Sequence, residues 1–382
     1  MNRTQLAIII VLIMLPQIVE TLYSPALVSM ALAFDVDSNS ISQTLSLYFV
    51  GFAVGVLIWG ILSDYIGRKP VLLIGLSIYS LCSVAILYSH DFDQLLLLRC
   101  LSGFGIAVGS VITQTMLRDR LNPSQLMQVF AWVGLFIAVS PSIGIFIGAL
   151  LTQYYGYRGV FYFLASSAAV IGICSAMCIR ETKATFASQH SSHNSTIPLF
   201  KISLRLITDA KVICFAALIT GYNLLIFSYY LKSAFLFSQH PQTAHWLPWS
   251  GVWISVGAVL GVAINRAILQ KHPHNSAALS LKLSAVLCLL ATALSYLLAA
   301  SAYFFLPMFL MMLAYAMAIP NLLAHALSAY PQHKGIASAI LGFSYYVAIG
   351  LLLEGLKWIP SLSQIFLIIS LSLVLLSAWV IH

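Results

Sequence analysis

Twelve apolar segments, each long enough to cross a lipid bilayer, follow one another along almost the whole chain. Their approximate ranges are 6–34, 41–63, 71–89, 95–117, 125–152, 159–179, 212–236, 246–270, 276–300, 303–328, 335–356 and 360–381. About 20 apolar residues are enough for an α-helix to cross the hydrocarbon core. Only 7% of the 382 residues are charged, whereas a soluble domain has about 25%. The sequence therefore predicts an all-α membrane protein with twelve transmembrane helices.

The basic residues are unevenly distributed among the connections between these segments. Thirteen of the 18 lysines and arginines lie on one set of alternate connections, and the opposite set holds only Arg158 and Lys357. Cytoplasmic loops of membrane proteins carry such an excess of positive charge. Both termini are therefore expected in the cytoplasm, and the net charge of +8 does not indicate a nucleic-acid partner.

One long polar connection divides the chain near its middle. It runs from Arg180 to about Lys211 and is rich in serine, histidine and threonine. We expect an N-terminal six-helix bundle over 1–183, a cytoplasmic linker over 184–208 and a C-terminal six-helix bundle over 209–382. The spacing of Gly60 and Asp64 recurs in Gly261 and Asn265, either as a remnant of an internal repeat or by chance.

The most specific motif lies at the end of the second apolar segment. Residues Gly60-Ile61-Leu62-Ser63-Asp64-Tyr65-Ile66-Gly67-Arg68-Lys69-Pro70 follow the pattern G-x-x-x-D-x-x-G-R-K. This stretch resembles the loop between helices 2 and 3 of the major facilitator superfamily. The resemblance implies two pseudo-symmetric six-helix bundles that transport a solute by alternating access. It also implies a cytoplasmic conformational latch of Gly60, Asp64, Gly67 and Arg68, with Asp64 able to meet the eleventh helix near Gly335.

Three further stretches resemble drug:proton antiporters, and in particular the Bcr/CflA subfamily. Residues 95–105 are similar to the helix 4 motif around Arg99, and residues 139–148 to the helix 5 antiporter motif with Pro141, Gly144 and Gly148. Residues 23–27 are similar to the subfamily's helix 1 pattern, except that the acid two residues before the tyrosine is replaced by Thr21. The resemblance implies proton-coupled efflux through the inner membrane of a bacterium.

Ionisable residues inside the apolar segments are the candidates for chemistry, because each costs at least about 2.5–3.5 kcal/mol at the bilayer centre. Glu20 lies midway along the first segment, where a carboxyl group that loses and regains a proton would serve proton coupling. We assign proton coupling to Glu20 and Arg99. The alternative for Glu20 is a purely structural hydrogen bond to a neighbouring helix.

Substrate binding is assigned to a separate set of residues within the apolar segments. The set is Tyr23, Tyr229, Lys232, Trp253 and His325. For the aromatic members the alternative is packing or a place in the interfacial belt, and for Lys232 it is a side chain that extends outward to the membrane surface.

The function expected from these features is secondary transport rather than catalysis, without a cofactor or a metal. The histidines lie mostly in loops, which disfavours a membrane-embedded enzyme, and a channel or receptor-like binding protein is the other alternative. The expected partners are a small-molecule substrate, protons and the bilayer, and the protein is expected to be a monomer. Export of a drug-like molecule competes with transport of an anionic metabolite such as a carboxylate siderophore, since Arg99 and Lys232 would favour an anion.

Overall fold

A computed structural model describes residues 3–182, 206, 208–238, 246–272, 275–299, 301–326, 330 and 334–381. The ordered elements of the first half are α1 (Arg3–Tyr23), η1 (Ser24–Ala26), α2 (Leu27–Ala33), α3 (Ser38–Ile66), α4 (Arg68–Leu87), α5 (Phe92–Ile106), α6 (Val108–Arg120) and α7 (Pro123–Cys178). Those of the second half are α9 (Ala210–Ser238), α10 (Leu247–Lys271), α11 (Ser276–Leu297), η4 (Ala302–Phe304), α12 (Phe305–Ala326), α13 (Lys334–Leu356) and α14 (Leu362–Ile381). The expected linker, 184–208, lies almost entirely outside the described residues.

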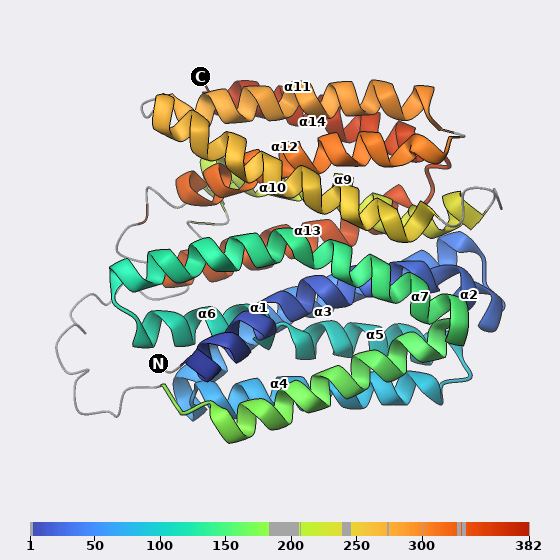
Figure 1. The fold of residues 1–382 in the computed structure, drawn as a ribbon, viewed down its shortest axis with the longest axis vertical. Helices are drawn as coiled ribbons and strands as arrows, with labels where there is room; N and C mark the ends of the chain where they lie inside the picture. Colours follow the sequence, from blue (N-terminus) through green and yellow to red (C-terminus); the bar gives the residue numbers. More distant parts are fainter. Residues whose placement is uncertain are drawn as a thin grey trace.

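The expected number of membrane crossings agrees with this architecture. Within the described part of the chain, eleven helical segments are long and apolar enough to cross a membrane. One of them, α7, reverses direction at Gly156 and supplies two crossings, so eleven segments give twelve spans (Figure 1). Gly156 has φ 62° and ψ −163°, a conformation that is open to glycine because it lacks a Cβ.

The two halves are built on the same pattern of close helix packing. A Cβ on Gly51 of α3 would lie 1.9 Å from the Cys100 carbonyl oxygen of α5, and a Cβ on Gly257 of α10 would lie 2.4 Å from the Phe309 carbonyl oxygen of α12. The second helix of each half therefore packs backbone to backbone against the fourth, as small residues allow in lipid. The shared contacts pair Gly51 with Gly257 and Gly55 with Gly261, so the halves are alike in packing, but Gly261 matches Gly55 and not Gly60 as the spacing in the sequence suggested.

The halves meet along two helix pairs and are closed at one end. The pair α3 and α13 and the pair α7 and α10 pack against each other across the interface, and η1 and α2 contact α9. Among the described residues, α6 and α12 do not pack together. Figure 1 shows both chain termini at the same end of the bundle, with α2 at the opposite end. The closed end is therefore the one remote from the termini.

Direct polar contacts hold this closed end. The Ser24 hydroxyl donates to the carbonyl oxygen of Tyr230 on α9. The Gln43 amide of α3 donates to the Glu354 carboxylate of α13 at 3.1 Å, and Lys357 pairs with the same carboxylate. The Ser24–Tyr230 and Gln43–Glu354 contacts join one half to the other, so both must break if this end opens.

Candidate functional site

Close packing against α7 fixes the rotation of α1. A Cβ on Gly144 would lie 1.8 Å from the Thr21 hydroxyl oxygen, and a Cβ on Gly148 would lie 2.2 Å from the Leu22 carbonyl oxygen. Pro141 is buried one turn earlier in α7. Thr21 therefore faces α7, and because successive helical residues are about 100° apart, Glu20 projects from a different face of α1.

The Glu20 carboxylate is buried at the interface of the two halves. Its side chain is 2% exposed, and its Oε2 has no hydrogen-bond partner among the described residues. Its charge acts on four tyrosine hydroxyls contributed by three helices of the second half: Tyr230, Tyr315, Tyr345 and Tyr346. A buried carboxylate oxygen without a partner is costly, so Glu20 is a candidate for binding a proton or a solute.

Arg99 of α5 lies near Glu20 but is held by aromatic rings. Its guanidinium carbon is 3.9 Å from the ring centre of Tyr23 and 4.8 Å from that of Tyr48. The Tyr23 hydroxyl donates to Thr44 at 2.6 Å, which fixes its ring. Arg99 is 1% exposed, and its Nε and Nη2 atoms have no hydrogen-bond partner. The Arg99 and Glu20 charges interact across space without an ion pair within 4.0 Å.

Aromatic rings line the interface around this charged pair. Phe49 of α3 lies 4.4 Å from Phe227 of α9, and Phe52 lies 4.6 Å from Tyr346 of α13, between ring centres. Tyr229 is buried, with its hydroxyl unpartnered. The hydroxyls of Tyr48 and Tyr230, on which the Glu20 charge acts, are also buried without a hydrogen-bond partner. Unpartnered hydroxyls near one buried carboxylate indicate a place for water or a solute.

Three of the residues assigned to substrate binding lie elsewhere. The Lys232 ammonium donates to the carbonyl oxygens of Ile359 and Pro360, just before α14. Trp253 is 40% exposed and stacks on Phe305. His325 is exposed in the last turn of α12. No described contact joins these three side chains to the Glu20 and Arg99 cluster, so we leave them out of the site proposed below.

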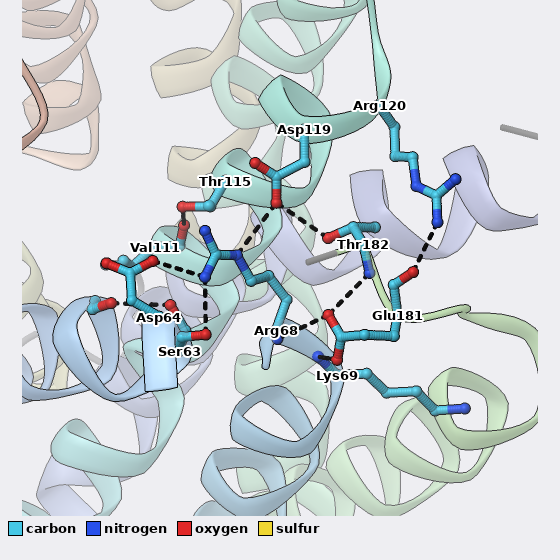
Figure 2. Close-up of polar contacts among 11 residues, drawn as sticks. Ser63, Asp64, Arg68, Lys69, Val111, Thr115, Asp119, Arg120, Glu181 and Thr182 are labelled. Carbon is cyan, nitrogen blue, oxygen red and sulfur yellow. Dashed lines mark hydrogen bonds and ion pairs between the residues drawn. The ribbon is translucent and has the colours of Figure 1, made fainter. Parts of the chain in front are cut away.

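The latch residues form an ionic network at the end of the helices that carries the termini. The Arg68 side chain donates to the Asp64 carboxylate at 2.7 Å and to the Asp119 carboxylate of α6 at 3.1 Å (Figure 2). It also donates to the Ser63 carbonyl oxygen at 2.8 Å. Arg68 therefore ties together α3, α4 and α6. Asp64 is 69% exposed, so the expected contact with α13 near Gly335 does not cover it.

Gly67 makes room for a second carboxylate. Its φ is 104°, and a Cβ there would lie 2.6 Å from a Glu181 carboxylate oxygen. The two Glu181 oxygens accept hydrogen bonds from the backbone N–H groups of Arg68 and Lys69 at 3.0 Å each (Figure 2). A carboxylate at the N-terminus of a helix is favoured by the helix dipole. Glu181 thereby connects the end of α7 to the start of α4.

The second half has a neutral counterpart of this network. The side-chain oxygen of Asn265 in α10 accepts from the Ser280 hydroxyl of α11 at 2.8 Å and from the Asn321 amide of α12 at 2.9 Å. Asn265 joins the three helices of its half that match α3, α4 and α6, but it does not stand at the position of Asp64, because the matched contacts of Gly51 and Gly257 place it opposite Trp59. The same three-helix connection is thus made by amides and a hydroxyl instead of ions.

Several members of these clusters are not predicted from the sequence. Asp119 lies between Arg118 and Arg120 at the end of α6, and Glu181 lies between Arg180 and Lys183 at the start of the long connection. That alternation of charge is the signal that could have found them. Tyr48, Tyr79 and Tyr315 stand in apolar segments without any motif. Only the burial of their side chains and the direction in which those side chains point distinguish these tyrosines from the many others in the chain.

Comparison with known proteins gives one consistent family. The family model for the Major Facilitator Superfamily matches residues 9–352. An uncharacterized transporter of Rickettsia bellii is 30% identical over 353 residues, which cover 88% of this chain and 85% of that protein. Multidrug resistance protein D of Escherichia coli is 29% identical over 182 residues, which cover 48% of this chain and 46% of that protein.

Two solved structures share the whole architecture. The nucleoside transporter NupG has a TM-score of 0.76 with 13% sequence identity, covering 99% of both chains. The D-xylose-proton symporter has a TM-score of 0.77 with 13% identity, covering 98% of this chain and 96% of that one. At this level of identity the likeness establishes the fold and leaves the solute open.

Proposed function

The chain belongs to the major facilitator superfamily and is a transporter rather than an enzyme, and from this premise we propose that it is a proton-coupled exporter of drug-like or other small organic molecules. The observation that carries this proposal is the buried Glu20 carboxylate with its unpartnered oxygen between the two halves. A carboxyl group in this setting binds and releases a proton as access alternates between the two sides of the membrane.

Two features support the assignment of the other roles. Arg99, held between Tyr23 and Tyr48, lies where its charge responds to the protonation of Glu20. The multidrug and bicyclomycin resistance proteins, which are similar to 48% and 44% of this chain, carry drug resistance in their names, which favours a drug-like solute here. We place the solute beside Glu20, Tyr23 and Tyr229.

The cellular setting follows from the same proposal. We place the protein in the inner membrane of a bacterium as a monomer, with both termini in the cytoplasm. The excess of basic residues on the connections at that end supports this orientation. The division into 1–183, 184–208 and 209–382 gives two bundles that rock about the buried site.

An anionic metabolite is the second candidate solute, and one observation favours it. The Nε and Nη2 atoms of Arg99 are buried without an acceptor, and a guanidinium can bind a carboxylate through two parallel hydrogen bonds. Protonation of Glu20 would then neutralise the carboxylate that otherwise competes with the solute for Arg99. The two candidates differ in which charged residue contacts the solute.

Transport by the purified protein in proteoliposomes tests the proposed function. An imposed pH gradient should drive accumulation of an ethidium-like cation, and addition of the cation should release protons in a fixed ratio. Citrate-like anions added in place of the cation test the second candidate. Solute movement that persists unchanged after the proton gradient is collapsed would contradict proton coupling.

Substitution of Lys232 by alanine should leave the affinity for either solute within about twofold of the parent value, as for substitutions outside a binding site. The reason is that the Lys232 ammonium is engaged by two backbone carbonyls. Arg99→Gln is the informative comparison, because loss of a charged hydrogen bond costs about 1.5–3 kcal/mol. Equilibrium titration of both variants measures this. A large loss of anion affinity in Lys232→Ala would restore this residue to the site.

Substitution of Asp64 by asparagine should slow turnover by up to about fivefold, since an exposed ion pair contributes at most about 1 kcal/mol. Solute affinity should be unchanged, because Asp64 lies in the network at the ends of the helices rather than beside Glu20. Turnover at saturation and binding are measured separately. Asp35→Asn, at an exposed carboxylate, is the matched control. Lost affinity with retained turnover in Asp64→Asn would refute the latch.

A further inference from the structure

An apolar crevice of about 530 Å³ opens on the outside of the second half, away from the Glu20 site. Its walls come from α9, α13 and α14, and α9 packs against both of the others. Within the described residues α13 and α14 do not pack against each other, and Figure 1 shows α13 close to α7 while α14 lies behind α11. The crevice is therefore the gap between α13 and α14, with α9 as its floor.

The corresponding helix of the first half is held differently. Gly144 and Gly148 of α7 draw α7 against α1, with hypothetical Cβ contacts of 1.8 and 2.2 Å. In α13 the close contacts of Gly350 are instead with Ser46 and Val50 of α3, in the other half. The small side chains of Ser344 and Ala348 on α13 line the crevice and leave room in it.

The chemistry of the walls excludes a polar ligand. Thr220, Ser344 and Ser372 are the hydroxyl residues of the lining. Each donates to a carbonyl oxygen of its own helix, at 2.8, 2.8 and 2.7 Å. The rest of the lining is apolar, so a ligand finds hydrocarbon contacts and no free donor. Ile213, Leu352 and Ile368 line the crevice and are about half exposed, which opens it to the surrounding bilayer.

The shape of the crevice suits one extended hydrocarbon chain. On α9 the lining runs from Val212 to Leu224, about 18 Å at 1.5 Å per residue. One leaflet of the hydrocarbon core is about 15 Å thick, half of about 30 Å. A crevice this long, parallel to the helices, matches the length of an acyl chain better than a compact solute.

Charge at one end of the crevice favours an anionic headgroup. Lys211 is exposed directly before the lining residues Val212 and Ile213. The nearby Asp209 carboxylate is already engaged by the Tyr330 hydroxyl at 2.7 Å and the Lys211 backbone N–H at 2.9 Å, and these bonds lower its pKa. Basic residues between transmembrane helices bind anionic lipid headgroups.

We propose that the crevice between α13 and α14 binds one acyl chain of an anionic phospholipid, with the headgroup at Lys211. The lipid fills the space behind α13, the helix that also contacts α3 of the other half. The lipid therefore packs against a moving helix with a flexible acyl chain, where rigid side chains would otherwise be needed. This proposal does not depend on the identity of the transported solute.

Photo-crosslinking of the full-length protein in nanodiscs tests the site. The probes are phosphatidylglycerol with a diazirine in the middle of one acyl chain, and phosphatidylcholine with the same chain. Peptide mass spectrometry should find phosphatidylglycerol label on α9, α13 and α14 above that on the exposed surface of α7. Lys211→Gln should lower this label by about fivefold, the factor for about 1 kcal/mol per basic residue, and leave the phosphatidylcholine label unchanged.

Variants with larger side chains that fill the crevice provide a second test of the lipid site. Ala217→Phe on α9 and Ala348→Phe on α13 replace lining residues from two walls, so at least one is expected to fold and to lose the label. Ala169→Phe, at an exposed position of α7, is the matched control and should label like the parent. Equal labelling of α7 and of the crevice helices by both lipids would overturn the proposal. Protection of the crevice by an ethidium-like solute would also overturn it, because the crevice would then belong to the solute pathway.

Discussion

Replacement of Glu20 by glutamine should reduce proton-coupled transport to background while the protein still folds and binds solute. Glutamine keeps the shape of the side chain but cannot exchange a proton. Glu20 is the ionisable carboxylate buried between the halves, and the tyrosines around it do not replace a carboxylate near neutral pH. Solute-driven proton movement in proteoliposomes measures the coupling directly, and binding is measured by titration of the purified protein.

Asp93→Asn is a matched control for this experiment. Asp93 is an exposed carboxylate at the start of α5, so its neutralisation removes a negative charge without touching the buried site. Coupling should be retained in this variant. Coupling at the parent level in Glu20→Gln would remove Glu20 from the mechanism and leave it with the structural role that the sequence also allowed.

Replacement of Gly51 by alanine should destabilise the protein severely, by about 1–3 kcal/mol or more, the range for overpacked interiors. The new Cβ would lie 1.9 Å from the Cys100 carbonyl oxygen and 2.8 Å from its carbonyl carbon. These are backbone atoms of α5, so the contact is relieved only if the two helices separate. The thermal unfolding temperature and the yield of monodisperse protein in detergent measure the effect.

The glycine-to-alanine substitution at Gly60, further along the same helix α3, provides the control. A Cβ on Gly60 of α3 would meet nothing nearer than Val111 Cγ1 at 3.8 Å, an ordinary contact. Alanine is also the better helix former by about 1 kcal/mol, so Gly60→Ala should be neutral or stabilising. Similar unfolding temperatures for the two variants would show that α3 and α5 do not pack as closely as the structure describes.

Hydrophobicity and charge were enough to predict most of the architecture. Each crossing needs an unbroken apolar segment, and each loop needs polar residues. The twelve segments and the two halves can therefore be recognised in the sequence. The reversal of the chain at Gly156 lies between the predicted segments 125–152 and 159–179, whereas the backbone conformation of this glycine could not be predicted from hydrophobicity.

Depth in the membrane could be predicted, but the direction of side chains could not. Lys232 and His325 stand in apolar segments as Glu20 does, yet the ammonium of Lys232 turns to the carbonyls of Ile359 and Pro360 and His325 is exposed. The position of Arg99 was indicated by its motif, but not the two tyrosine rings that hold it. Those rings come from segments far apart in sequence, and only packing brings them together.

The contrast between the two three-helix networks has a consequence for how the halves respond to their surroundings. Arg68, Asp64 and Asp119 are ions near the water boundary, and salt weakens the attraction between exposed charges by screening them. Asn265 and its partners carry no net charge, so added salt leaves their hydrogen bonds almost untouched. An increase in ionic strength on the side of the membrane that carries the termini therefore weakens the contacts of the first bundle selectively. The two related halves thus differ in mechanical stiffness, although their helices follow the same plan.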